Sequence, residues 1–589
     1  MISFLPTTKE DVHDRGWSRL DVILVTGDSY IDSPHIGVAV IGRVLEDAGY
    51  RVGVIAQPDP DTPEDILRLG HPTLFWGVTG GSVDSMVANY TALKKKRRSD
   101  DFTPGGVNDR RPDRAVIVYT NLIRRYGRPG VPIVLGGIEA SLRRVSHYDF
   151  WSDRIRRSIL FDAKADILVY GMGEKTITAL AEALQNNEDY RPIRGLCFKA
   201  GQPPPEALIL PDHETVARDA DAFRAMFKQF YHNNDPVTGR VLCQRQDTRY
   251  LVQNPPPTPH SVAELDAVYA LKYTYDQHPF YENQGPVRAL ETIRFSLATH
   301  RGCYGECRFC AIAVHQGRTV QWRSPESLLN EARRLGNHPG FKGVLQDVGG
   351  PTANMYGFEC ARKQRRGACR HRRCLFPEVC EHLPVNHARQ MALLKALRRL
   401  PGMRRVFVAS GLRCDLAMAD RRAGQAYVDA LAGAHVSGQL KIAPEHTAPE
   451  VLALMGKSGR DLLPFRKLFL QASRAAGKRQ YLTYYFMAAY PGTTDEHMRQ
   501  LKSFCRTRLK IAPEQVQIFT PTPSTFAALM YWTEKDPFSR RKLFVEKDPA
   551  RKQRQKNQLL PRQTVRPGKQ SSRSFRKPPN RPKRRRNPS

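Results

Sequence analysis

The sequence predicts an α/β protein with two main domains and a basic C-terminal tail. Six short apolar runs alternate with helical patterns before residue 187, which is typical of an open, doubly wound sheet. Six more apolar runs alternate with amphipathic stretches between residues 291 and 545, which is typical of a parallel barrel. From residue 551 to the end, the chain carries fifteen Lys and Arg and no acid.

The first domain is predicted to cover residues 1–187. Its strands are expected at 21–25, 51–55, 73–76, 115–118, 132–135 and 166–169. Ligands of such domains bind at the carboxyl ends of the strands, where this chain places Gly27, Gly136, Gly137, Gly171 and Gly173. These glycines are equally consistent with tight turns and close packing, so they predict a crevice without naming its ligand.

Residues 188–290 are predicted to connect the two domains. A proline-rich break spans residues 254–259, and such runs adopt extended conformations. No motif in the connector indicates chemistry.

The second domain is predicted to cover residues 291–545. Its strands are expected at 293–297, 343–347, 405–409, 438–442, 481–485 and 516–519. Between them lie amphipathic helices at 325–335, with Ser324 as the capping residue, and at 494–504. Barrel enzymes carry their chemistry at the carboxyl ends of the strands, so ligand contacts are sought just after each run.

Three cysteines, Cys303, Cys307 and Cys310, follow the first strand of this domain in a C-x3-C-x2-C arrangement. Electron-transfer clusters are usually closed by four cysteines, so three leave one iron of a 4Fe-4S cluster open to another ligand. Gly302 and Gly305 permit the tight turn that such a loop requires. A zinc site and ordinary thiols remain alternatives, although zinc sites usually combine two C-x2-C pairs or add histidines.

The loop and its surroundings resemble the radical SAM superfamily, and residues 10–545 resemble the YgiQ family of uncharacterised radical SAM proteins. The resemblance implies a partial (β/α)6 barrel with the cluster at the top of its first strand. It also implies reductive cleavage of S-adenosylmethionine (SAM) to methionine and a 5′-deoxyadenosyl radical. The electron would come from a flavodoxin or a reductase. The substrate is not implied.

Five further residues are predicted to contact SAM. Gly349 and Gly350 resemble the Gly-Gly-Glu motif that contacts the methionine amino group; Pro351 stands in place of the acid, so backbone carbonyls would make the contact. Arg413 could hold the SAM carboxylate and Glu445 its ribose, with surface ion pairing as the alternative. Phe309 could lie against the adenine ring.

A cysteine-rich insertion at about 357–384 carries Cys360, Cys369, Cys374 and Cys380 among many arginines. Neighbouring cations lower the pKa of thiols and favour the thiolate that metals bind. The spacings of eight, four and five intervening residues match neither a zinc ribbon nor a bacterial ferredoxin. A second metal site and structural thiols are both open interpretations.

The N-terminal domain resembles the cobalamin-binding-like domain that precedes the barrel in many radical SAM proteins. Here Asp32, His35 and Gly37 are spaced DxxHxG, whereas the base-off cobalamin motif is DxHxxG. The sequence therefore argues against cobalamin and indicates that His35 is a loop residue or a substrate contact. Methylthiolation of tRNA is also disfavoured, because those enzymes resemble each other in having cluster cysteines in the N-terminal domain, and no cysteine precedes Cys197.

The net charge of +34 is concentrated in part at the C-terminus. Residues 546–589 are predicted to be disordered, and such a tail contacts RNA nonspecifically. No apolar run is long enough to cross a membrane and no signal peptide is recognised, so a cytoplasmic protein is expected, in keeping with reduced cysteines. The alternative function is a metal-stabilised binding protein associated with RNA or ribosomes.

Overall fold

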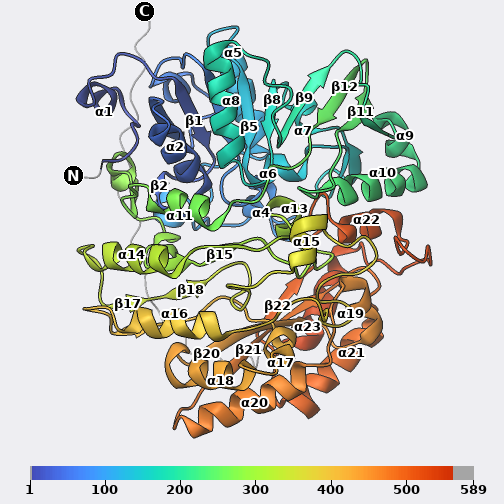
Figure 1. The fold of residues 1–589 in the computed structure, drawn as a ribbon. Coiled ribbons are helices and arrows are strands. Elements are labelled where there is room, and N and C mark those ends of the chain that lie inside the picture. Colours follow the sequence, from blue (N-terminus) through green and yellow to red (C-terminus); the bar gives the residue numbers. More distant parts are fainter. Residues whose placement is uncertain (1–2, 562–589) are drawn as a thin grey trace, which may run out of the picture.

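The computed structural model describes residues 3–561, which form two stacked halves (Figure 1). The N-terminal half is built on a nine-stranded sheet in the order β10-β11-β12-β9-β8-β5-β4-β1-β3. Its strands are β1 (Val22–Thr26), β3 (Val52–Ala56), β4 (Phe75–Thr79), β5 (Ile133–Gly136), β8 (Ile167–Val169), β9 (Leu196–Ala200), β10 (Leu208–Leu210), β11 (Leu242–Gln246) and β12 (Arg249–Gln253). The five strands from β3 to β8 in the sheet are parallel, as expected for a doubly wound domain.

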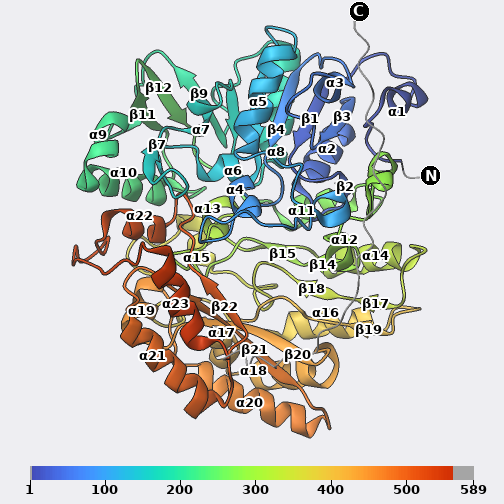
Figure 2. The ribbon, with the colours of Figure 1, turned by 180° about the vertical axis from the view of Figure 1, so that it is seen from behind.

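Helices cover both faces of this sheet, and Figure 2 shows α3 and α5 on the face opposite α2 and α8. The helices of this half are α1 (Lys9–Asp14), α2 (Gly37–Asp47), α3 (Glu64–Leu67), α4 (Ser85–Asn89), α5 (Ala115–Tyr126), α6 (Gly137–Leu142), α7 (Ile159–Asp162), α8 (Glu174–Asn186), α9 (His213–Arg218), α10 (Ala220–Asn233), α11 (Val262–Ala270) and α12 (Leu290–Ile293). Short ladders pair β2 (Ile31–Asp32) with β13 (Asp276–Gln277) and β6 (His147–Asp149) with β7 (Arg154–Arg156).

One strand prediction in this half is wrong. Residues 115–118 begin α5 instead of forming a strand. Ala115, Val116, Tyr119, Leu122 and Ile123 are all buried, and their spacing repeats with the period of a helix. The β-branched run at the start of the segment hid this longer pattern.

The predicted connector is also more than a link. Residues 188–290 contribute β9 to β12, which extend the N-terminal sheet beyond its parallel part. Farther along, β13 returns to pair with β2, and the Tyr281 hydroxyl accepts a hydrogen bond from the Ala56 N–H at 3.0 Å. The segment therefore belongs structurally to the N-terminal half.

The C-terminal half carries a strand or strand pair at each of the six predicted places. Its strands are β14 (Ser296–Ala298), β15 (His300–Arg301), β16 (Gln321–Trp322), β17 (Val344–Leu345), β18 (Asp347–Gly349), β19 (Arg405–Val406), β20 (Gln439–Glu445), β21 (Tyr481–Ala488) and β22 (Gln515–Ile518). Parallel ladders join β14 to β18, β17 to β19, and β20 to β21 to β22. These pairings follow the chain order of a barrel, while its assignment as a six-unit partial barrel stays a prediction.

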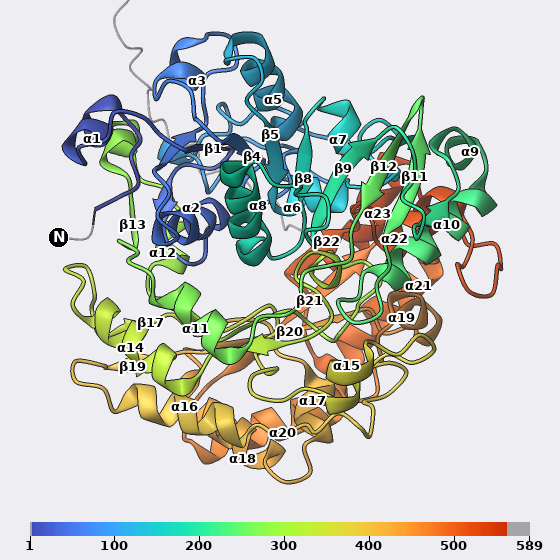
Figure 3. The ribbon, with the colours of Figure 1, turned by 45° about the horizontal axis from the view of Figure 1, so that its top comes forward.

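The helices of the C-terminal half are α13 (Ile312–His315), α14 (Pro325–Gly336), α15 (Ala361–Arg366), α16 (Ala388–Arg398), α17 (Cys414–Ala419), α18 (Gly424–Ala430), α19 (Pro449–Met455), α20 (Leu462–Ala475), α21 (Asp495–Phe504), α22 (Phe526–Thr533) and α23 (Pro549–Leu559). Among them, α14, α16, α18 and α20 lie outside the strands (Figure 3). The Ser324 hydroxyl caps α14 by accepting a hydrogen bond from the Ser327 N–H. Thr494 caps α21 in the same way through His497.

The predicted disordered tail begins too early. Residues 549–559 form α23, which is capped by Asp548 and packs beside α21 and β22. Its Gln555 side chain is buried and accepts a hydrogen bond from the Ala489 N–H at 2.9 Å. Residues 562–589, the rest of the predicted tail, lie outside the described residues.

The apolar core is continuous across the two halves. One buried cluster runs from Val22 and Leu24 in the N-terminal sheet to Leu440 and Phe486 in the C-terminal strands. Apolar burial is the main favourable term in folding, so the two halves support each other. No helix among residues 3–561 is long and apolar enough to cross a membrane.

Candidate active site

The loop that carries the three predicted ligands, called the cluster loop below, runs from Gly302 to Ala311, between β15 and α13. Gly302 has a φ of +80°, and a Cβ there would lie 2.1 Å from the carbonyl oxygen of Thr319. Only glycine tolerates both the conformation and the contact. Cys303 is held by the same neighbouring segment, because its N–H donates to the Gly317 carbonyl at 3.2 Å. The turn is therefore fixed by its surroundings.

The three thiols of this loop are half-buried. Burial and the neighbouring thiols raise the pKa of Cys310 to about 12, and burial and Cys307 raise the pKa of Cys303. A bound cationic group would relieve this by stabilising the thiolates. Within residues 3–561 no three His, Cys, Asp or Glu side chains converge to hold one metal ion. The assignment of these thiols as ligands of a 4Fe-4S cluster stays a prediction.

Arg413 lies directly beside these thiols. Its Nη1 donates a hydrogen bond to the Cys307 Sγ at 3.5 Å, and its Nε donates to the Asp415 Oδ1 at 2.9 Å. The guanidinium and the Asp415 carboxylate are both largely buried. Arg413 is therefore placed to hold positive charge next to the predicted cluster; its predicted contact with the SAM carboxylate stays a prediction.

Gly349 and Gly350 stand at the end of β18, on the wall of a cavity. The Gly349 carbonyl accepts hydrogen bonds from the Thr299 N–H at 2.7 Å and the Thr299 hydroxyl at 3.1 Å. A Cβ on Gly350 would lie 2.6 Å from the Cε1 of His300. Of the two carbonyls predicted to meet the SAM amino group, the one at Gly349 is already bonded within the protein.

Glu445 lies at the end of β20, and Phe309 lies within the cysteine loop itself. Glu445 ends β20 with a φ of +66°, and burial raises the pKa of its carboxyl although Lys457 Nζ lies 3.6 Å away. The ring of Phe309 meets that of Tyr490 edge to face, with centroids 6.2 Å apart. Neither arrangement tests a contact with ribose or adenine, so both assignments stay predictions.

The cysteine-rich insertion packs against the cluster loop. Cys360 is buried in an apolar cluster with Tyr304 and Phe358, and Cys303, Cys374 and Cys380 pack at its edge. Cys369 is exposed and apart from them. The expectation that nearby cations would lower the thiol pKa is wrong for Cys374: burial outweighs Lys363 and raises that pKa to about 12. A second metal site in the insertion stays a prediction.

A cavity of about 500 Å³ lies between the two halves, within the size range of small-molecule sites. One wall is formed by the carboxyl ends of β1, β4, β5 and β8 and by the start of α2. The other wall comes from the ends of β14, β15 and β18 and from α13. The cavity therefore joins the crevice predicted for the doubly wound sheet to the barrel face that carries the cysteine loop.

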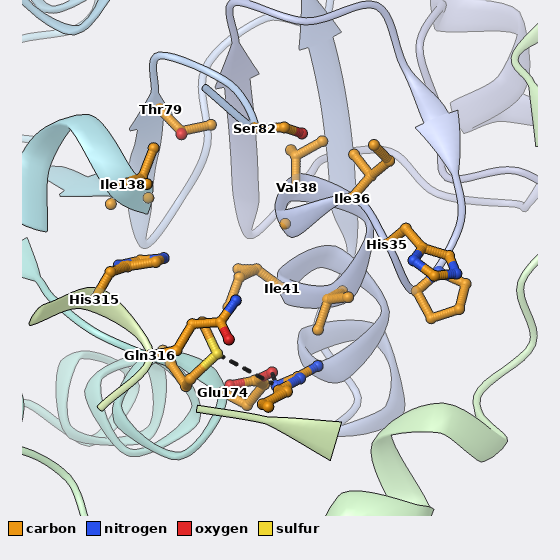
Figure 4. Close-up of a pocket in the computed structure, with 18 of the residues that line it drawn as sticks. His35, Ile36, Val38, Ile41, Thr79, Ser82, Ile138, Glu174, His315 and Gln316 are labelled. Carbon is orange, nitrogen blue, oxygen red and sulfur yellow. Dashed lines mark hydrogen bonds and ion pairs between the residues drawn. The ribbon is translucent and has the colours of Figure 1, made fainter. Parts of the chain in front are cut away.

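Sequence reasoning missed several polar residues of this cavity. His315 directs its imidazole into it, opposite the apolar side chains of α2 (Figure 4). Burial lowers the pKa of His315 to about 4, and its Nδ1 has no hydrogen-bond partner within the described chain. His300 is 2% exposed, and its Nε2 likewise has no partner there. Their positions in the sequence could have indicated them, because both histidines flank the cysteine loop.

His35 also lines the cavity, but its ring is already engaged. Its Nε2 lies 3.0 Å from the Ser296 carbonyl oxygen, and a carbonyl can only accept, so this nitrogen carries the proton. Asp32 is buried in an ion pair with Arg43 and accepts a hydrogen bond from the Thr274 N–H. The DxxHxG segment thus joins the two halves at this corner.

A doubly wound domain, a parallel-stranded domain and a three-cysteine loop whose flanking residues line the shared cavity define a radical SAM enzyme. Residues 4–296 match the family model described as Radical SAM N-terminal, and residues 297–505 match the Radical SAM superfamily. The chain belongs to the UPF0313 family. It is 52% identical to a UPF0313 protein of Fusobacterium nucleatum, over 94% of this chain and 98% of the relative. It is 47% identical to a UPF0313 protein of Thermotoga maritima, over 95% and 98%.

Among solved structures, the chain is similar to TsrM of Kitasatospora setae, a radical S-adenosylmethionine methyltransferase with cobalamin and a 4Fe-4S cluster bound. The match covers 87% of this chain and 74% of that one, with a TM-score of 0.50 and 15% identity. The prediction that cobalamin is disfavoured is therefore wrong. It took the DxHxxG spacing as a requirement for cobalamin binding, and TsrM carries cobalamin on a similar fold.

Proposed function

We propose that this enzyme holds a 4Fe-4S cluster through Cys303, Cys307 and Cys310 and cleaves SAM reductively to start a radical reaction. One observation carries the proposal: three half-buried thiols, two of them with a raised pKa, share one loop, and the Arg413 guanidinium donates to the Cys307 Sγ at 3.5 Å from a separate loop. When bound, the cluster supplies the electron that breaks a carbon–sulfur bond of SAM, giving methionine and a 5′-deoxyadenosyl radical.

The chain's own residues would bind and shield the reactants. The carbonyl of Gly350 would accept from the SAM amino group, and Glu445 and Phe309 would contact ribose and adenine. Arg413 would balance the negative charge of the thiolates or hold the SAM carboxylate. The cavity walls would exclude water from the radical, and this protects a reactive intermediate from side reactions.

The same cavity favours cobalamin as a second cofactor. Its N-terminal wall lies at the carboxyl ends of the parallel strands, where doubly wound domains bind large ligands. Its apolar lining from Ile36, Val38 and Ile41 would face the macrocycle. His35 would not ligate cobalt, since its Nε2 donates to Ser296. The cofactor would be held by shape and by backbone contacts.

A flavodoxin or a reductase would deliver the electron, in a reducing compartment such as the cytoplasm. The basic residues beyond 561 would add a nonspecific contact with RNA.

The first test is SAM cleavage. The protein would be reconstituted anaerobically with iron and sulfide, reduced with dithionite and given SAM, and 5′-deoxyadenosine would be measured beside a variant with all three cysteines changed to alanine. We expect product only from the unchanged protein. Cys307→Ala alone should lose the cluster; an intact cluster spectrum in that variant would contradict the ligand assignment. Cys374→Ser is the matched control and should keep the cluster.

A further inference from the structure

The cysteine-rich insertion covers the outer side of the cluster loop. Arg373 donates a hydrogen bond to the Glu306 carbonyl, and Lys363 Nζ donates to the Arg318 carbonyl at 2.7 Å. The rings of Tyr304 and Phe358 pack with centroids 5.8 Å apart. The insertion is thus anchored to the cluster loop and to the segment that follows it.

The outer face of this cover is strongly basic. Five of its arginines are exposed: Arg362, Arg365, Arg366, Arg370 and Arg372. Within residues 3–561 none of them forms an ion pair or a side-chain hydrogen bond, whereas Glu359 is paired with Lys363 and Glu378 with Arg460. Like charges on one surface repel each other in the isolated protein and become favourable beside an acidic partner.

An exposed aromatic residue adjoins this face. The guanidinium of Arg308, in the cluster loop itself, lies 4.4 Å from the ring centroid of Phe538 and 5.9 Å from that of Phe376. Phe538 is 50% exposed. Exposed aromatics next to arginines are the residue types that carry binding energy at protein interfaces.

The position of the face indicates what the partner does. Arg301 and Ile312, which flank the cluster loop, line the cavity, where SAM and substrate would sit. An electron donor must therefore approach from the outer side, and electron transfer needs a short path. The basic insertion packs against the loop on that side. A nucleic acid would be attracted by positive charge anywhere on the surface, and its binding does not require a position beside this loop.

We propose that the cysteine-rich insertion is the docking surface for an acidic flavoprotein that reduces the cluster. The proposal rests on the proposed function, because it assumes a cluster in the loop. One electron leaves the anionic flavin hydroquinone of the donor, which becomes a neutral semiquinone without moving a proton, and the oxidised cluster takes up that electron.

The test uses a charge-reversed full-length variant, Arg365→Glu with Arg366→Glu and Arg370→Glu. The matched control reverses three exposed cations on the N-terminal half, Lys95→Glu with Lys96→Glu and Arg98→Glu, whose side chains have no partners in the described chain. Cluster reduction would be followed by the loss of visible absorption, with a reduced acidic flavodoxin or with dithionite as donor. Binding of the oxidised flavodoxin and of a labelled single-stranded RNA would be measured by calorimetry and fluorescence.

We expect flavodoxin-driven reduction and flavodoxin binding to fall about tenfold or more in the insertion variant, and salt to abolish the difference, because steering accounts for rate effects of this size. Dithionite-driven reduction should be unchanged in both variants. Equal losses in both variants, or none, would overturn the proposal. So would a loss of dithionite-driven reduction, or a fall in RNA binding with flavodoxin binding intact. If the cluster is reduced but SAM is not cleaved, the proposed function fails, while the docking proposal is still decided by the reduction and binding measurements.

Discussion

Arg413 donates a hydrogen bond from Nη1 to the Sγ of Cys307 across 3.5 Å. The arginine lies on the loop after β19 and the cysteine on the loop after β15, so the contact joins two parts of the parallel-stranded domain. A fixed cation next to a thiolate stabilises its charged form. The pair therefore links the predicted ligand set to the start of α17, where Asp415 holds the arginine in place.

Replacing Arg413 should affect folding and cluster chemistry separately. Arg413→Gln leaves Asp415 as an unpaired buried charge, so we expect a loss of about 3 to 5 kcal/mol in the free energy of unfolding. Arg413→Gln with Asp415→Asn should recover most of that stability. Both variants should hold a cluster with a more negative reduction potential, because a nearby positive charge favours the reduced form. An unchanged potential in the stable double variant would show that the guanidinium does not act on the cluster.

Gly302 and Gly317 form a matched pair of glycines with positive φ. Gly302→Ala places a Cβ 2.1 Å from the Thr319 carbonyl oxygen, whereas Gly317→Ala meets nothing within 4 Å. We expect Gly317→Ala to cost about 1 to 2 kcal/mol from backbone strain alone. Gly302→Ala should cost more and also lower the iron content after reconstitution, since the turn carries Cys303. Iron analysis and urea unfolding of both variants test this expectation. Equal iron content in the two variants would show that the conformation of Gly302 does not affect cluster binding.

His35 should be dispensable for binding a corrinoid. If hydroxocobalamin binds in the cavity, its absorption spectrum and affinity should be the same in His35→Ala within about twofold, since the imidazole is committed to the Ser296 carbonyl. The paramagnetic resonance spectrum of bound cob(II)alamin should lack a histidine nitrogen coupling. Such a coupling in the unchanged protein, absent from His35→Ala, would restore His35 as a cobalt ligand.

Buried neutral histidine should make the fold sensitive to mild acid. Burial lowers the pKa of His300 from 6.5 to about 4. Between these values the unfolded chain takes up a proton that the folded chain refuses, so stability falls as the pH drops from 6.5 toward 4. The slope is about 1.4 kcal/mol per pH unit for one such group. Thermal midpoints of the unchanged protein and of His300→Gln at pH 7 and pH 5 should converge at the lower pH; a constant difference between them would exclude this histidine as the cause.

Much of the fold could be predicted from the sequence because buried parallel strands form continuous apolar runs that are visible locally. Apolar runs bounded by glycine placed β1, β3, β4, β5 and β8 and all six strand positions of the C-terminal half. The failure at residues 115–118 came from reading four β-branched and apolar residues without the helical spacing that follows them. The antiparallel extension β9 to β12 was missed because its pairing depends on contacts between distant residues, which no local pattern encodes.

The candidate site divides in the same way. The three cysteines are adjacent in sequence and their spacing alone indicates a shared ligand. The contact of Arg413 with Cys307 joins residues far apart in the sequence of one half, and the environment of His315 depends on the meeting of the two halves, so neither could be inferred from a local pattern. The error over cobalamin arose because one histidine spacing was used to judge a cavity whose walls come from both halves.

Helix α23 sets a practical limit on how the chain can be shortened. Its Gln555 binds the backbone of Ala489, and the Gln555 Nε2 also reaches the Thr493 carbonyl. A shortened protein designed to remove the lysine- and arginine-rich end should therefore stop after residue 561. Stopping at residue 545 would leave the buried face of α21 and the end of β21 open to water, and would turn a trimming step into a loss of solubility.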